Sequence, residues 1–135
     1  MKQASVVHFE MPSKDNKRVS KFYETAFGWK MQQMGADFGN YLMVQTSETD
    51  KQGMSKTPGT INGGFFKFED KEGYNSPHLV LSVENITKSI EDVENNGGEI
   101  LNGPMDIPNV GKYVSFKDTE GNIVGMLQSF RMPQE

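Results

Sequence analysis

Two histidines and one glutamate are the residues whose types and spacing could do chemistry. His8 and Glu10 lie in a run rich in β-branched and aromatic residues, which predicts a strand. Side chains two apart on a strand share a face about 6–7 Å apart, so Glu10 can project beside His8. Imidazole is a ligand for transition metals, and a carboxylate beside it could act as a general base. His78 opens a second such run, and the chain holds no other histidine.

The composition excludes several classes of function. The chain has 135 residues, which fits a single domain over 1–135. Its net charge is −4, and its basic residues are scattered apart from one short helical group, so we expect no nucleic-acid partner. That group is Lys14, Lys17, Arg18 and Lys21, which predicts a solvated helix face. The chain has no cysteine, which excludes disulfides and thiolate sites. No apolar run approaches the roughly 20 residues of a membrane span, so we expect a cytoplasmic protein without a membrane partner.

The first half of the chain predicts a strand, a helix and three further strands. The first strand covers 4–11 and ends at Pro12. Ser13 or Asp15 can cap a helix that runs to Phe27 and ends at Gly28. Its predicted buried stripe is Val19, Phe22, Tyr23 and Phe27. Strands follow over 29–33, 41–46 and 61–68, and 47–59 forms the longest loop.

The second half repeats this order. It predicts a strand over 78–83, a helix over 86–94 and strands over 99–101, 113–116 and 122–130. His8 aligns with His78 at an offset of about 70, and after the long loop the offset falls to about 62, which aligns Gly63 with Gly125. Repeat one covers about 4–68 and repeat two about 77–130. We therefore predict an α+β fold of two tandem βαβββ repeats, forming a curved mixed sheet with a concave cleft and the helices outside.

Several short motifs, taken in order, resemble the vicinal-oxygen-chelate superfamily of glyoxalases, bleomycin-resistance proteins and extradiol dioxygenases. The motifs are His8, Phe22-Tyr23, Phe27-Gly28-Trp29, His78 to Ile86, Asn96-Gly97-Gly98 and Phe116 to Asn122. The resemblance spans nearly the whole chain and is greatest to small proteins related to lactoylglutathione lyase. In the metal-using members, two helix-preceding residues and two final-strand carboxylates converge on one ion. The resemblance places His8 and His78 at the first two positions.

The two carboxylate positions fall on Gly63 and Gly125, which have no side chain to offer. A divalent zinc, nickel, manganese or iron ion bound by His8 and His78 would need other ligands, so a metal-free site is favoured. Because side chains alternate along a strand, we expect Phe65 on the same face as Gly63 and Phe66 on the face toward the helices. The predicted ligand cleft is lined by His8, Glu10, Gly63, Phe65, His78, Val80 and Gly125.

Three functions remain open from the sequence. The first is a metal-free small-molecule binder that resembles the bleomycin-resistance proteins. The second is a metal-dependent lyase, isomerase or dioxygenase that acts on vicinal oxygens through His8 and His78, with Glu10 as its catalytic base. The third is a non-catalytic interaction module. The resemblance also implies a homodimer, because half-sized modules often complete their clefts across a two-fold interface.

Overall fold

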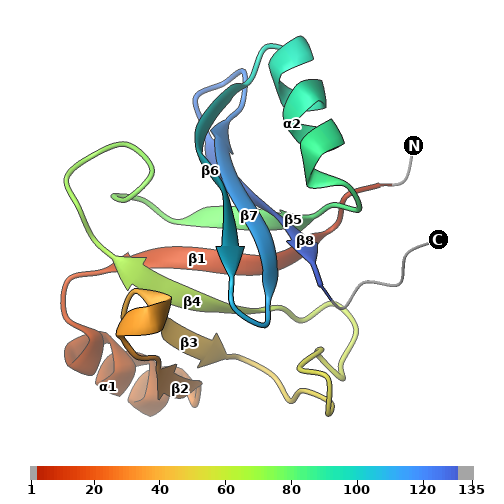
Figure 1. The fold of residues 1–135 in the computed structure, drawn as a ribbon. Coiled ribbons are helices and arrows are strands. Elements are labelled where there is room, and N and C mark those ends of the chain that lie inside the picture. Colours follow the sequence, from red (N-terminus) through yellow and green to blue (C-terminus); the bar gives the residue numbers. More distant parts are fainter. Residues whose placement is uncertain (1–2, 131–135) are drawn as a thin grey trace. The chain divides into compact units, whose positions relative to one another are not determined.

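The computed structural model describes residues 3–130, which form two compact units. The repeat-one unit is His8–Pro77, and the repeat-two unit is the remaining described residues, 3–7 and 78–130. Each unit follows the order strand, helix and three strands (Figure 1). The α+β class and the two βαβββ repeats predicted from the sequence are confirmed.

The repeat-one unit contains a four-stranded mixed sheet. Its strands lie in the order β2-β3-β4-β1, with β1 and β4 parallel and the other pairs antiparallel. Its elements are β1 (Val6–Ser13), which belongs to this unit from His8 onward, α1 (Asn16–Phe27), β2 (Lys30–Gln33), the short 3₁₀ helix η1 (Ala36–Phe38), β3 (Leu42–Gln45) and β4 (Asn62–Lys67).

The repeat-two unit has the same topology. Its strands lie in the order β5-β8-β7-β6, with β5 and β8 parallel and the other pairs antiparallel. Figure 1 shows α2 beside β6 and β7 within this unit, and α2 contacts both strands. Its elements are β5 (His78–Ser82), α2 (Ile86–Asn95), β6 (Glu99–Ile107), β7 (Gly111–Lys117) and β8 (Ile123–Ser129).

Both helices begin at an Asx cap in the same repeat position. Asp15 Oδ1 accepts from the Arg18 N–H at 3.0 Å, and Asn85 Oδ1 accepts from the Lys88 N–H at 3.1 Å. Each cap satisfies a donor that the first helical turn leaves without an intrahelical partner. Asp15, not Ser13, is therefore the cap of α1.

Each unit has its own hydrophobic core between its helix and its sheet. In the repeat-one unit, the buried residues Leu42, Val44 and Phe65 pack with half-buried residues that include Val19 and Tyr23 of α1. In the repeat-two unit, the core residues are Val83, Ile86, Val114, Phe116 and Met126. The helices are thus held by burial of one apolar stripe each.

The predicted buried stripe of α1 is half wrong. Val19 and Tyr23 reach the core, but Phe22 and Phe27 are 56 % and 64 % exposed. Phe22 precedes Tyr23 and so points about 100° away from it around the helix, and Phe27, four residues after Tyr23, is the last residue of α1. Phe22 packs edge-on against Tyr23, with ring centroids 4.9 Å apart, rather than against a strand.

Two strands extend beyond their predicted ends because they tolerate proline. β1 continues through Pro12, which stays in register opposite Phe66 of β4. The fixed φ of proline suits extended backbone, and only alternate residues of a strand donate toward a given neighbour. β6 continues past residue 101 because register shifts between Ile100 and Met105 absorb the irregular Gly103-Pro104 segment.

The Asp118 motif forms the turn between β7 and β8. Asp118 Oδ1 accepts from the Glu120 and Asn122 N–H groups at 2.8 and 2.9 Å, and its Oδ2 accepts from Asn122 Nδ2 at 2.9 Å. The hydrogen bond from the Asn122 side chain, followed by those from the backbone, lowers the pKa of Asp118. This family motif therefore has a structural role in the turn.

Candidate functional site

The alternation of side chains divides β1 between two faces. Phe9 and Met11 pack in the core of the repeat-one unit, on the side of α1. His8 and Glu10 therefore project from the opposite face. The parallel register sets Gly64 of β4 beside Glu10, and the missing side chain at Gly64 leaves room on that face.

Tyr41 occupies this room. A Cβ built on Gly64 would overlap the Tyr41 ring. The Tyr41 hydroxyl donates to Glu10 Oε2 at 3.0 Å and lies 3.1 Å from His8 Nε2. A carboxylate only accepts, so the single Tyr41 proton is directed at Glu10 and His8 Nε2 must carry a proton that it donates to the Tyr41 oxygen. The three side chains form a directed chain of hydrogen bonds, from His8 through Tyr41 to Glu10.

Burial controls the charge of His8. Removal of the ring from water lowers the pKa of His8 below 6.5, and the nearby Glu10 carboxylate opposes this shift only in part. His8 is therefore a neutral imidazole at pH 7 with its proton on Nε2. Within the His8–Tyr41–Glu10 cluster, the negatively charged group is the Glu10 carboxylate.

Because the pKa of His8 is lowered in the folded protein, the folded state loses stability at acidic pH. The unfolded chain binds a proton to His8 at about 6.5, and the folded chain binds it only at lower pH. The contribution of His8 to stability is therefore complete above pH 6.5 and is lost as the pH falls below it. Urea denaturation of a His8→Gln variant across this range should give a smaller loss of unfolding free energy than in the wild type. Equal losses in the two proteins would contradict the assignment.

The repeat-two unit has the same arrangement of a histidine, a tyrosine and a glycine, but it lacks the carboxylate. His78 and Val80 are both buried, and Val80 stands opposite Gly125 of β8 in the position that Glu10 has opposite Gly64. Tyr113 again fills the room over the glycine, because a Cβ on Gly125 would lie 2.9 Å from Tyr113 Cε2. Each repeat thus presents a histidine, a tyrosine and a glycine, and only repeat one adds a carboxylate.

The strand register corrects the alignment of the glycines. Gly64, rather than Gly63, is the counterpart of Gly125, since Glu10 pairs with Gly64 and Val80 pairs with Gly125. A shift of one residue moves a position to the other face of a sheet. Gly63 faces α1, where a Cβ would lie 2.6 Å from the Phe9 ring, so Gly63 lies outside the predicted ligand face.

The same one-residue shift of register also corrects the predicted position of Phe65. It was expected to line the pocket, but it is buried in the core, with its ring centroid 5.7 Å from that of Tyr23 in α1. Phe66, expected to face the helices, instead projects from the other face and packs against Tyr74. The doubled glycine before these residues allowed either register in the sequence, and only strand pairing selects one.

The residues present do not fit the four-ligand metal site that the family resemblance implies. Gly64 and Gly125 offer no ligand atom, and tyrosine rings occupy the space above both of them. Within residues 3–130, no three histidine or carboxylate side chains are grouped so that they could hold a metal ion. His8 is also already engaged by Tyr41.

Three functional or positioning residues were not assigned from the sequence. Tyr41 and Tyr113 occupy aligned positions in the two repeats, and that recurrence of a polar aromatic residue was the available signal. Gln128 accepts from the Ile86 N–H at 2.8 Å and so completes the N-terminus of α2 from a distant strand. No local pattern in the sequence marks this contact.

The chain matches the Glyoxalase/Bleomycin resistance protein/Dioxygenase superfamily over residues 5–126. The chain belongs to this superfamily. A glyoxylase-like domain-containing protein of Didymella fabae is 32 % identical to it over 119 residues, which are 84 % of each chain. The superfamily resemblance drawn from the sequence is therefore confirmed.

Solved structures of the same fold include enzymes. A methylmalonyl-CoA epimerase in complex with methylmalonyl-CoA and NH4+ superposes with a TM-score of 0.70 and 15 % identity, covering 99 % of this chain and all of that one. A hypothetical protein from Bacillus halodurans C-125 gives a TM-score of 0.68 at 13 % identity, with the same coverage. These likenesses establish the fold.

No helix within residues 3–130 is long and apolar enough to cross a membrane.

Proposed function

We propose that this glyoxalase-superfamily protein binds a small molecule without a metal ion, on the face of the repeat-one unit that carries His8, Glu10 and Tyr41. The observation that supports this most directly is the position of Tyr41. Its ring covers Gly64, where the family resemblance would require a ligand carboxylate, and its hydroxyl links the histidine to the carboxylate. A hydrogen-bonding site here takes the place of a coordination site.

The hydrogen-bonding groups of the cluster restrict the ligand. Burial lowers the pKa of His8, so the ring is neutral at pH 7, and Glu10 accepts from Tyr41. A molecule with hydroxyl groups can donate a hydrogen bond to this carboxylate. We therefore expect a ligand with hydrogen-bond donors, such as a vicinal diol or an enediol.

Tyr41→Phe tests the proposal with catechol as a neutral vicinal-oxygen probe and benzoate as its anionic counterpart. Catechol should shift the backbone NMR signals of β1 and β4 around His8 and Gly64, in the presence of EDTA, and benzoate should not. Tyr41→Phe should weaken catechol about tenfold, because it removes the hydrogen bond, worth about 1.5 kcal/mol, that holds the Glu10 carboxylate in place for the ligand. A matched control is Tyr74→Phe, because Tyr74 packs against Phe66 outside the cluster.

Several outcomes would contradict metal-free binding. Binding that EDTA abolishes, or tight stoichiometric uptake of zinc, nickel, manganese or iron(II) that a His8→Ala/His78→Ala double variant loses, would restore the metal-dependent alternative. Equal catechol affinity in Tyr41→Phe and in the wild type would remove Tyr41 from the site.

Proton transfer is a second candidate, favoured by the directed chain from His8 through Tyr41 to Glu10. In this mechanism Glu10 is the general base, and Tyr41 and His8 hold its carboxylate in place through the chain of hydrogen bonds. Because structures of this fold include a methylmalonyl-CoA epimerase, solvent deuterium incorporation into methylmalonyl-CoA is a direct assay. Incorporation that Glu10→Gln abolishes would establish an enzyme.

We also propose that the protein is a cytoplasmic homodimer whose two repeats unfold as one domain. Multi-angle light scattering should give twice the mass of 15.2 kDa at micromolar concentration. A monomer mass across the accessible concentrations would contradict the dimer.

A further inference from the structure

The N-terminal end of α1 has an unfavourable distribution of charge. The first turn of a helix carries a partial positive charge and is stabilised by acidic residues. In α1 the first turn contains no acidic residue, and Lys17 and Arg18 stand there instead, just after Lys14. Asp15 is the single carboxylate among them, and its Oδ1 is used as the helix cap. Residues that break a local rule of stability are often kept for a functional reason.

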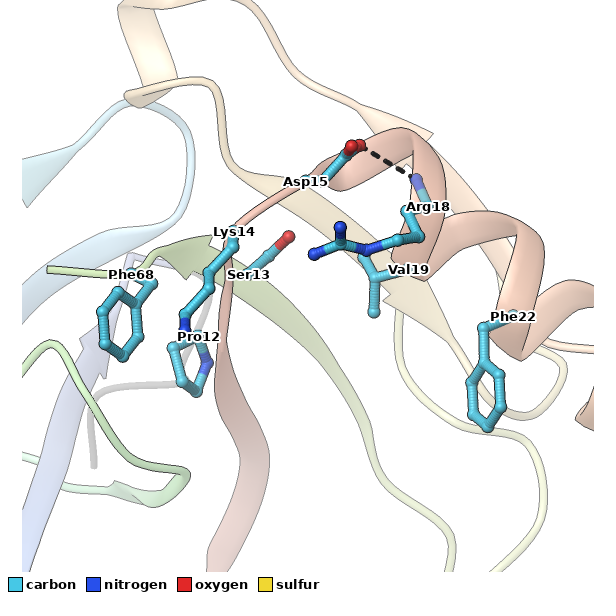
Figure 2. A pocket seen from close by; sticks show the side chains of 8 residues that line it. All are labelled: Pro12, Ser13, Lys14, Asp15, Arg18, Val19, Phe22 and Phe68. Carbon is cyan, nitrogen blue, oxygen red and sulfur yellow. Dashed lines mark hydrogen bonds between the residues drawn. The ribbon is translucent and has the colours of Figure 1, made fainter.

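A hollow of about 480 Å³ lies at this end of the helix. Figure 2 shows side chains from the end of β1, from the first two turns of α1 and from the residue after β4 around it. All of them belong to the repeat-one unit. The lining residues are Pro12, Ser13, Lys14, Asp15, Arg18, Val19, Phe22 and Phe68.

Ser13 supplies a second, independent sign of a ligand. The residue is only 6 % exposed and lines the hollow, and its Oγ has no hydrogen-bond partner within the part of the chain that the structure describes. A buried hydroxyl without a partner costs about 1–3 kcal/mol, so such groups are uncommon unless something else meets them. In Figure 2 the Ser13 hydroxyl lies on the same side of the turn as the Arg18 side chain.

The two cations of the hollow are available to a ligand. Among residues 3–130, neither Lys14 nor Arg18 forms an ion pair with a carboxylate. The Lys14 ammonium lies 4.5 Å from the centroid of the Phe68 ring, which holds it at the edge of the hollow. Arg18 is exposed, so its guanidinium can turn toward a bound group, and its planar fork matches a carboxylate or phosphate.

The rest of the lining is apolar. Val19 and Pro12 form aliphatic walls, and Phe22 exposes more than half of its surface at the rim. An inorganic anion would use only the charged end of this hollow. A molecule that joins an anionic group to a ring or acyl chain would also cover the apolar walls and gain the burial free energy of that contact.

We infer that this hollow binds a small organic anion with an apolar body. Its carboxylate or phosphate lies between Lys14 and Arg18 and accepts from the Ser13 hydroxyl, while its ring or chain lies on Val19, Phe22 and Phe68. The site shares no residue with the His8–Tyr41–Glu10 cluster, so the protein has a second binding site.

Phenyl phosphate is the probe that tests this inference. Titrated into the full-length protein, it should shift the backbone NMR signals of residues 13–19 and 68 with a dissociation constant near 1 mM or below, about −4 kcal/mol. Inorganic phosphate should bind at least about fivefold more weakly, because it lacks the apolar body. Arg18→Gln should weaken phenyl phosphate about tenfold, since it removes a charge-assisted bond.

Two variants separate a binding role from a structural one. Lys17→Gln makes the same change of charge on the same helix but lies outside the hollow, so it should alter the affinity less than about twofold. Ser13→Ala removes the hydroxyl without a partner, so it should leave the stability unchanged or raise it while it weakens binding.

The inference is overturned by any of three results. The first is no binding of phenyl phosphate at about 10 mM. The second is equal weakening in Arg18→Gln and Lys17→Gln, which would show a diffuse charge effect. The third is a set of shifted signals around His8 and Gly64 instead of the hollow.

Discussion

A Gly64→Ala variant is expected to lose about 2 kcal/mol of unfolding free energy, because an added Cβ would overlap the Tyr41 ring. The ring cannot move aside freely, since its hydroxyl is held by Glu10 at 3.0 Å and lies 3.1 Å from His8. Displacement would break both contacts in a half-buried place, and shifting β4 would disturb its pairing with β1. Urea denaturation measures this loss as a lower midpoint with an unchanged m-value.

A double-mutant cycle isolates the clash. In a Tyr41→Ala background the space over Gly64 is open, so Gly64→Ala should cost less than about 1 kcal/mol there. Gly35→Ala is the matched control, because its Cβ would meet only the end of the Asp37 side chain, at 3.1 Å. Equal losses from Gly64→Ala in both backgrounds would show that Tyr41 does not fill the ligand position of the family.

Leu42→Ala is expected to cost about 3 kcal/mol, within the 2–5 kcal/mol range of such core truncations. Leu42 is 2 % exposed and packs with Phe65 and Val44 in the core of the repeat-one unit. Its loss would leave a cavity in a core that has few other buried residues. Thermal and urea denaturation should both show the loss.

The next residue along β3 supplies the control. Met43 is 38 % exposed and projects from the other face, so Met43→Ala should cost less than about 1 kcal/mol. Similar losses at both positions would contradict the assignment of faces on β3, and with it the placement of Tyr41 on the Glu10 face.

Periodicity and caps were enough to predict most of the fold. The two helices and the repeated βαβββ order follow from local residue types, and the structure contains them, with Asp15 as one of the two caps expected for the first helix. Boundaries failed where proline was expected to stop a strand, because the strand tolerates Pro12 while its neighbour stays in register.

The candidate site was predicted in part. His8 and Glu10 were expected on one face from their spacing alone, and both contact Tyr41. Phe65 was placed on the wrong face, since the doubled Gly63-Gly64 admits two registers that differ by one residue. The contact of Tyr41 with Glu10 was not predicted, because the two residues lie 31 positions apart and no local pattern joins positions so distant.

The sequence by itself determined the family, the repeat and the absence of carboxylates from the positions that the family uses for metal ligands. These depend on residue identity and spacing, which no packing can alter. Only the tertiary structure decided what fills those positions. Strand register selects which glycine faces the site, and the approach of β3 to β4 brings Tyr41 over Gly64. Hydrogen bonds between strands, rather than any local preference, set both of these contacts.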